Sequence, residues 1–324
     1  MDLPWLSDLT DSWRSQTTQG RMPHAVLLQG PAGVGKRCAA AWMLSDFLGL
    51  EADNSKPVYP LQLPEHADFR RVCMPEDKKS IGVDQIRGLV AELQLTSYEG
   101  GGKGALIDPA DAMTVNAANS LLKTLEEPPG SSLLILVADG PARLPSTILS
   151  RCQRINIPAP AEAVSLAWLD TLRPATQWPA ALAVAGMAPL GAIEALEQLP
   201  VVDEMARDLA AIAERRAAPL EVAARWAKLE QGFVLDWLCR EVQNTIYWTG
   251  GGGRHANGAQ PADSVLRRID RRNLFCYLDI INRLRSQGAG SFNVQLALES
   301  LLIDWAEGLS GCTASAIAGP LGTR

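Results

Sequence analysis

The stretch "HAVLLQGPAGVGKRCAA", residues 24–40, decides the fold of the first half of the chain. It opens with an apolar run typical of a buried strand, passes through a glycine-rich turn and continues as a helical pattern. Gly30, Gly35 and Lys36 stand where the phosphate-binding motif G-x-x-x-x-G-K-[ST] requires them, and Gly33 lies inside the loop. Strand, loop and helix in this order predict a phosphate loop.

The last position of the motif departs from the consensus. Ser or Thr there would offer a hydroxyl to Mg²⁺, but this chain has Arg37, which has no lone pair and is permanently cationic. We therefore expect a degenerate loop that tolerates phosphate and repels Mg²⁺. Two interpretations remain open here: an ATPase with an unusual loop, or a protein that has kept the loop and lost the chemistry.

The rest of the first half alternates apolar runs with helical patterns. Further strands are predicted within residues 68–75, 103–111, 132–140 and 153–158. Helices are predicted within residues 36–50, 83–95 and 116–130. Such alternation predicts a parallel sheet covered on both faces, with ligands beyond the carboxyl ends of its strands.

A carboxylate follows the strand predicted within residues 103–111. ATPases of this type need an Asp for the metal shell and usually a Glu to orient the attacking water. The chain has Asp108 in this region, but Pro109 follows it, and Asp111 cannot be assumed to replace the missing Glu. Given Arg37, we interpret Asp108 and Asp111 as residues that stabilise the turn and cap at the end of this strand.

After about residue 160 the patterns are helical, with almost no strand signal. The fold class predicted is α/β followed by all-α, with domains at residues 1–160, 161–203 and 204–324. Residues 248–264 read as a glycine-rich loop, and the last residues as a disordered tail.

Composition excludes several classes of protein. The net charge is −6, which disfavours a protein that grips DNA alone, and the basic run at 267–272 is typical of a solvated helix face or a subunit contact. The six cysteines lack C-x-x-C pairing and indicate free thiols without a metal site. Neither a signal peptide nor a membrane-spanning run is found, which predicts a cytoplasmic protein.

Four segments together resemble the clamp-loader branch of the AAA+ ATPases. They are "MPHAVLLQGPAGVGK" (22–36), "VDQIR" (83–87), "NAANSLLKTLEEPP" (116–129) and "LPSTILSRCQRI" (144–155). The resemblance implies a RecA-like AAA+ domain, a small helical lid and a C-terminal helical collar that joins subunits. It also implies a subunit of the bacterial DNA polymerase III clamp loader, with motor (gamma or tau) and delta subunits as partners. Through that complex the chain would support loading of the sliding clamp onto primed DNA.

The resemblance assigns the most informative role to Ser150-Arg151-Cys152. In clamp loaders this arginine points across a subunit interface at the neighbour's ATP, where it would act as an arginine finger in trans. The alternative is an arginine that pairs locally at a strand edge. The combination of motifs favours the finger, with Ser150 and Cys152 as motif neighbours.

The departures from motor subunits all indicate a subunit that does not hydrolyse ATP. Besides Arg37 and Pro109, the chain has Ala138-Asp139 where motor subunits carry a Thr-Thr, and residues 185–196 lack a nucleotide-contacting arginine. We expect no required cofactor and at most vestigial nucleotide binding by Gly30, Gly33, Gly35, Lys36, Arg37 and Asp108.

Related subunits often carry four zinc-binding cysteines after the first helix, but residues 51–68 contain none, so no zinc is expected.

Because of its departures from motor subunits, the chain is expected to lack ATPase activity of its own and to act within the DNA-directed DNA polymerase holoenzyme. Two enzymatic alternatives remain. One is a motor-type ATPase in which Asp111 and another group take over the missing roles. The other is a small-molecule kinase, which the helical second half and the "SRC" and "LLKTLEEPP" segments disfavour.

Overall fold

A computed structural model of the chain describes residues 1–50, 56–75, 78–140, 144–174, 177–250, 269, 271–287 and 292–310. The chain divides into two compact units. The first comprises Met1–Trp178 and Met187–Ile193, and the second comprises Pro179–Gly186 together with the residues from Glu194 onward.

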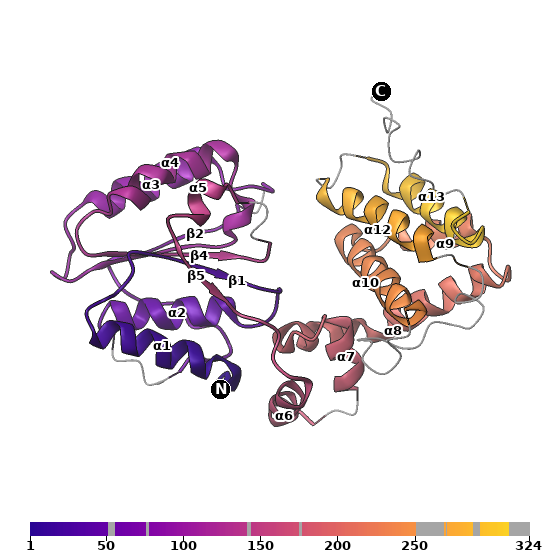
Figure 1. Ribbon diagram of the computed structural model, residues 1–324, viewed down its shortest axis with the longest axis horizontal. Coiled ribbons are helices and arrows are strands. Elements are labelled where there is room, and N and C mark those ends of the chain that lie inside the picture. Colours follow the sequence, from indigo (N-terminus) through magenta and orange to yellow (C-terminus); the bar gives the residue numbers. More distant parts are fainter. Residues whose placement is uncertain are drawn as a thin grey trace. The chain divides into compact units, whose positions relative to one another are not determined.

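The first unit is built on a parallel sheet with the strand order β2-β3-β4-β1-β5 (Figure 1). Its strands are β1 (Ala25–Gln29), β2 (Phe69–Val72), β3 (Lys103–Ile107), β4 (Ser132–Ala138) and β5 (Gln153–Asn156). Its helices are η1 (Pro4–Leu6), α1 (Ser7–Thr18), α2 (Lys36–Phe47), α3 (Val83–Gln94), η2 (Ala110–Ala112), α4 (Val115–Glu126), α5 (Ser146–Leu149) and α6 (Glu162–Leu172). All five predicted strands and the predicted parallel sheet are confirmed.

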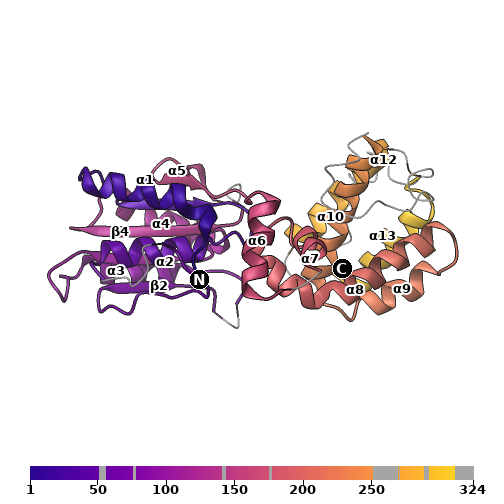
Figure 2. The same cartoon turned by 90° about the horizontal axis from the view of Figure 1, so that it is seen from below.

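Burial explains why the strands leave apolar runs in the sequence. Every residue of β3 is buried, as are four of the five residues of β1, because helices cover both faces of the sheet. Helices α3 and α4 lie on one face and α1 and α2 on the other (Figures 1 and 2). The face beneath α3 and α4 carries a core cluster that includes Leu27, Ile107, Leu121 and Leu136.

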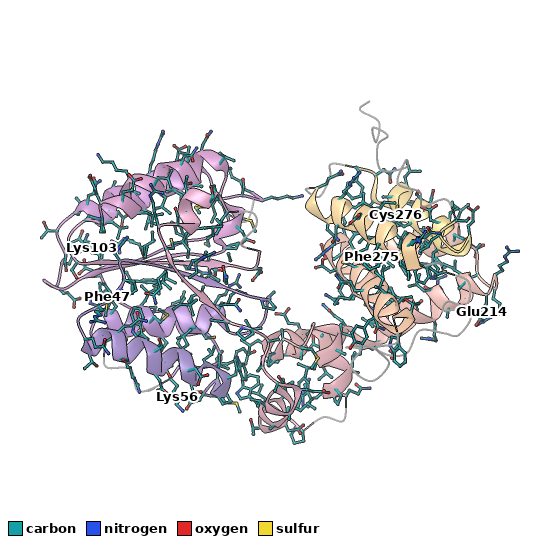
Figure 3. The ribbon with its side chains drawn as sticks, in the orientation of Figure 1. Phe47, Lys56, Lys103, Glu214, Phe275 and Cys276 are labelled. Carbon is teal, nitrogen blue, oxygen red and sulfur yellow. The ribbon has the colours of Figure 1, made fainter. Side chains whose placement is uncertain are left out.

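The two ends of this sheet differ in what they carry. The strands begin near Lys103 of β3, and Figure 3 shows this residue at the same end of the unit as Phe47 of α2. Lys103 is buried there and donates from Nζ to the carbonyl of Glu92 at 2.8 Å. The phosphate loop follows β1 at the opposite end, where the strands of a parallel sheet finish together.

The second unit is helical throughout its described residues. Its helices are α7 (Trp178–Val184), α8 (Pro189–Ala213), α9 (Pro219–Trp226), α10 (Gln231–Thr249), α12 (Arg271–Ser286) and α13 (Val294–Ala306); the first residue of α7 and the first turn of α8 belong to the first unit. Its core contains edge-to-face Trp226 and Trp237, whose ring centroids lie 5.7 Å apart. The α/β then all-α fold class is thereby confirmed.

The predicted domain boundaries meet the observed elements in different ways. The boundary after residue 160 lies just before α6, whereas the boundary after residue 203 falls inside α8. The division into three domains stays a prediction. The glycine-rich loop after residue 250, half of the basic run at 267–272 and the predicted tail lie outside the described residues. Arg271 and Arg272 of that run begin α12.

Among the described residues, no single helix is long and apolar enough to cross a bilayer. Helices α7 and α8 meet that criterion only as a pair, with a bend of 105° between them.

Candidate functional site

The phosphate loop connects β1 to α2 and is packed closely on several sides. Gly30 has φ 147°, and a Cβ there would lie 2.1 Å from the carbonyl oxygen of Ile157. Gly33 has φ 78°, and a Cβ there would lie 2.6 Å from the backbone nitrogen of Gly191. Glycine is therefore required at both positions by conformation and by space.

Two segments from elsewhere in the first unit lie against this loop. The backbone N–H of Leu190 donates to the carbonyl of Gly33 at 2.9 Å, which fixes the start of α8 to the loop. From the N-terminal segment, the indole of Trp5 donates to the carbonyl of Val34 at 2.9 Å. The loop is thus held in place by hydrogen bonds to its own chain.

The ammonium group of Lys36 is already used inside the protein. Lys36 is 4 % exposed, and its Nζ donates to the carbonyls of Gly30 at 2.8 Å and Pro31 at 2.5 Å. The same Nζ lies 2.6 Å from Oδ1 of Asp139, immediately after β4. An ammonium has three donors. These contacts account for all three, so an incoming phosphate would have to displace an internal partner.

Arg37 pairs with the carboxylate that an active ATPase would give to its metal shell. Its Nε donates to Oδ1 of Asp108 at 3.0 Å and lies 2.8 Å from Oδ2. Arg71 of β2 approaches the same carboxylate, with Nη2 3.3 Å from Oδ2. The Asp108 side chain is buried, whereas those of Arg37 and Arg71 are 57 % and 33 % exposed. Asp108 is therefore a buried anion held between two arginines.

The residues around Asp108 do not fit a Mg²⁺ ion. Such an ion binds through oxygen ligands, usually one or two carboxylates together with substrate phosphates. Here the one carboxylate lies against two permanent cations, and Arg37 contributes nitrogen donors instead of a hydroxyl oxygen. Bringing a divalent cation to this point would require breaking both ion pairs against the repulsion of two guanidinium groups.

Asp111 does not contact the Arg37–Asp108 pair. It lies in η2, and its Oδ2 accepts a hydrogen bond from the backbone N–H of Gly140 at 3.2 Å. This contact ties η2 to the loop after β4, as turn chemistry at a strand end would. Asp111 therefore has a structural partner.

Arg151 lies at the other end of the sheet from the phosphate loop. In the parallel pairing of β1 with β5, Val26 is opposite Gln153 and Gln29 is opposite Asn156. Arg151 precedes β5, so about six strand residues, roughly 20 Å, separate its level from that of Gly30. An arginine side chain cannot span that distance, so Arg151 cannot act on a nucleotide in its own loop.

The guanidinium of Arg151 makes contacts within its own chain. Its Nη1 donates to the carbonyl of Thr147 at 3.1 Å and to Oγ of Ser150 at 3.3 Å. Its Nη2 donates to Oε1 of Glu126, the last residue of α4, at 2.5 Å. The Arg151 side chain is 34 % exposed. The "LLKTLEEPP" and "SRC" segments, 25 residues apart from Glu126 to Arg151, therefore meet in one ion pair.

The two neighbours of Arg151 have different environments. Ser150 donates from Oγ to the carbonyl of Thr147 at 3.1 Å and also accepts from Arg151. Cys152 is buried in the core cluster of the first unit, and this burial raises the pKa of its thiol to about 11. Cys152 is thus an unreactive, buried thiol next to a partly exposed arginine.

Three partners of the predicted site residues were not identified from the sequence. The sequence marks Asp139 only as a departure from the motor subunits and gives no role to Arg71 or Glu126. Arg71 carries a weak signal, because it lies on a strand next to β3 in the sheet. Glu126 stands in a motif that the sequence does single out.

No group of three or more His, Cys, Asp or Glu residues in the described part of the chain is placed to hold a metal ion. Of the predicted zinc-free segment, residues 51–55 lie outside the described residues. The expectation that the chain needs no zinc stays a prediction. In the described part, Cys38, Cys73, Cys152, Cys239 and Cys276 are free thiols.

An open apolar groove of about 690 Å³ also lies in the first unit, between the N-terminal segment and α6. It is lined by residues such as Pro4, Val164 and Trp168. None of the predicted site residues lines it.

Comparison with known proteins agrees with these motifs. A family model described as DNA polymerase III, delta subunit, matches residues 5–161. The DNA polymerase III subunit delta′ of Pseudomonas aeruginosa is 32% identical over 321 residues, covering 94% of this chain and 97% of that protein. The DNA polymerase III subunit tau of Bacillus subtilis is 30% identical over 151 residues, covering 46% of this chain and 27% of that protein.

A solved structure of a DNA polymerase III gamma subunit-related protein from Thermotoga maritima aligns with a TM-score of 0.47 at 16% identity, covering 91% of this chain and 98% of that one. The assignment does not depend on that likeness. It follows from the similarity to the Pseudomonas aeruginosa protein, which extends over nearly the full length of both chains. This chain belongs to the family of DNA polymerase III delta′ subunits.

Proposed function

We propose that this chain is a clamp-loader subunit that does not hydrolyse ATP itself and supplies Arg151 to the ATP of a neighbouring motor subunit. In this role it supports loading of the sliding clamp onto primed DNA. The observation that carries the proposal is the pairing of Arg37 with buried Asp108, because it puts a fixed cation where a hydrolytic site needs a metal.

The contacts of Lys36 support the same conclusion. A motor subunit uses this lysine on the outer phosphates of its nucleotide. Here the carboxylate of Asp139 lies 2.6 Å from the ammonium, which makes an internal anion the partner of the lysine. Pro109 also removes the position from which a Glu would orient water. Any nucleotide bound by this loop would be weakly held and without a required Mg²⁺.

The register of β5 supports an action in trans. Arg151 lies at the end of the sheet where the strands begin, about 20 Å from its own phosphate loop by strand geometry. Its side chain is partly exposed and bears a fixed positive charge. A nucleotide at this end of the sheet would therefore have to belong to another subunit.

The partners follow from the family. Relatives of this chain include proteins named as delta′ and tau subunits of DNA polymerase III. We infer that this chain assembles with motor (gamma or tau) and delta subunits and reaches the clamp and DNA through them. Its net charge of −6 accords with nucleic-acid contacts that are shared with partners. A cytoplasmic location is part of the same proposal.

The decisive experiment measures ATP hydrolysis by the purified chain and by the reconstituted complex with clamp and primed DNA. The chain alone should show no turnover above background. Arg151→Ala should lower the clamp- and DNA-stimulated ATPase of the complex by at least about tenfold. Arg154→Ala is the matched control, because Arg154 is an exposed arginine three residues away.

Two results would contradict the proposal. Turnover by the isolated chain at the level of a motor subunit would instead favour the motor-type alternative. Equal ATPase and clamp loading in the Arg151→Ala, Arg154→Ala and unsubstituted complexes would remove the finger assignment. Assembly of each complex, checked by gel filtration, distinguishes a catalytic loss from a missing subunit.

A further inference from the structure

The ion pair between Glu126 and Arg151 joins two segments that each have a reason to be rigid. Glu126 is the last residue of α4, and Pro128 and Pro129 follow it closely, so the helix ends at a fixed point. Arg151 follows the short helix α5 and precedes Cys152, which is buried in the core. Both partners of the pair are therefore carried by well-anchored backbone.

The contacts of Arg151 leave part of its guanidinium available. An arginine has five N–H donors. Thr147 and Ser150 take the two donors of Nη1, and Glu126 takes one donor of Nη2. Within the described part of the chain, the Nε–H and the second N–H of Nη2 have no acceptor. Two donors of a partly exposed guanidinium thus remain for an anion from outside the chain.

The three intrachain contacts also restrict how the arginine can move. A free arginine side chain on a surface samples many rotamers, and ordering it opposes binding. Here one end of the guanidinium is held by acceptors at the end of α5 and the other by the carboxylate at the end of α4. The orientation of the remaining donors is therefore set before any partner arrives.

We propose that Glu126 is a positioning residue that holds the guanidinium of Arg151 in the orientation needed to meet the γ-phosphate of a neighbouring subunit's ATP. This inference rests on the proposed role of Arg151 and adds a second residue to it. Glu126 does not touch the nucleotide. It acts through Arg151 alone, by reducing the number of arginine conformers from which the contact with phosphate must be selected.

The exposure of Glu126 and Arg151 indicates that their ion pair is too weak to keep Arg151 from binding phosphate. The side chains of Glu126 and Arg151 are 51 % and 34 % exposed, so water screens the attraction between them. Exposed ion pairs of this kind are weak, whereas an arginine finger on a transferring phosphoryl group changes the rate by orders of magnitude. Glu126 can therefore orient Arg151 without competing strongly with the phosphate for its guanidinium.

The test compares Glu126→Gln with Glu127→Gln in the reconstituted complex. Glu127 is the matched control, because it is the adjacent exposed glutamate and the same charge is removed. Glu126→Gln should lower the kcat for ATP of the complex about three- to fivefold and leave the KM for ATP unchanged, as expected for the loss of one exposed ion pair. Glu127→Gln should leave kcat within about 1.5-fold of the unsubstituted complex, because the Glu127 side chain has no partner among the described residues.

A double-variant cycle separates positioning from a structural effect. In an Arg151→Ala background, Glu126→Gln should cause no further loss of kcat, because no arginine is left to orient. An equal loss in both backgrounds would overturn the inference, as would a Glu126→Gln complex that is as fast as the control or faster. Those outcomes leave the proposed function intact when Arg151→Ala alone is slow, whereas a fully active Arg151→Ala complex would remove both.

Discussion

Substituting Arg37 by threonine would restore the hydroxyl that the phosphate-loop consensus requires. If the departure at this one position explained the loss of a metal site, Arg37→Thr should bind Mg²⁺-ATP and turn it over. We expect neither result. Lys36 would still be paired with Asp139, Arg71 would still lie 3.3 Å from the Asp108 carboxylate, and Pro109 would still stand where a Glu is needed.

The same substitution should destabilise the first unit by an amount that follows from the contacts. Asp108 is buried and would keep only Arg71 as a charged partner. A hydrogen bond to a charged group contributes about 1.5–3 kcal/mol. Because Arg37 is 57 % exposed, screening reduces that contribution, and we expect a loss of about 1–2 kcal/mol. This corresponds to a Tm lower by about 3–6 °C for a unit of this size.

A double-variant cycle with Asp108→Asn isolates the pair from the helix propensity of threonine. Urea unfolding of the four proteins should give a coupling free energy of about 1–2 kcal/mol between positions 37 and 108. A coupling below about 0.3 kcal/mol would show that the ion pair does not stabilise the fold. Steady-state ATP turnover by Arg37→Thr at the level of a motor subunit would refute the argument that several contacts, and not one, close this site.

Three further predictions concern the loop, a carboxyl group and the thiols. Gly33→Ala should lower the free energy of unfolding by about 2–4 kcal/mol in thermal unfolding, because φ is positive there and a Cβ would meet the backbone of Gly191. Gly20→Ala is the control: it has φ 65° but open space around its Cβ position, and it should cost only about 1 kcal/mol. Burial raises the pKa of Glu241 to about 7, so between pH 5 and pH 7 the folded state binds a proton that the unfolded state has lost. The Tm should therefore fall from pH 5 to pH 7, and Glu241→Gln should make this fall smaller. Iodoacetamide at pH 8 should alkylate exposed Cys73 and leave Cys152 unmodified in the native protein by mass spectrometry, because the raised pKa keeps the buried thiol protonated.

The sequence predicts the sheet well for a physical reason. Strands covered on both faces are apolar at nearly every position, so β1, β3 and β4 stand out as apolar runs between turn residues. Helix α1 (Ser7–Thr18) was not predicted. Only Thr10 and Trp13 of that helix are buried, so its sequence has little apolar periodicity.

The site could be predicted only as far as its motifs are contiguous. Gly30 to Arg37 form one segment, and the backbone of a phosphate loop follows from that segment alone. The pairs that decide its chemistry join Lys36 to Asp139 and Arg37 to Asp108, over separations of 103 and 71 residues. Such pairs arise from strand order, which brings β1, β3 and β4 together, and a single sequence does not reveal them.

The ammonium of Lys36 has its own counter-ion, and this has a consequence for the clamp-loading cycle. A ligand moves a protein between conformations only by as much as its affinity differs between them. Because Lys36 is paired with Asp139 and Gly33 is hydrogen-bonded to Leu190, we expect the affinity of this loop for ATP to differ little between conformations of the subunit. Within the proposed complex, we therefore expect this chain to keep the same conformation whether or not its neighbours hold ATP.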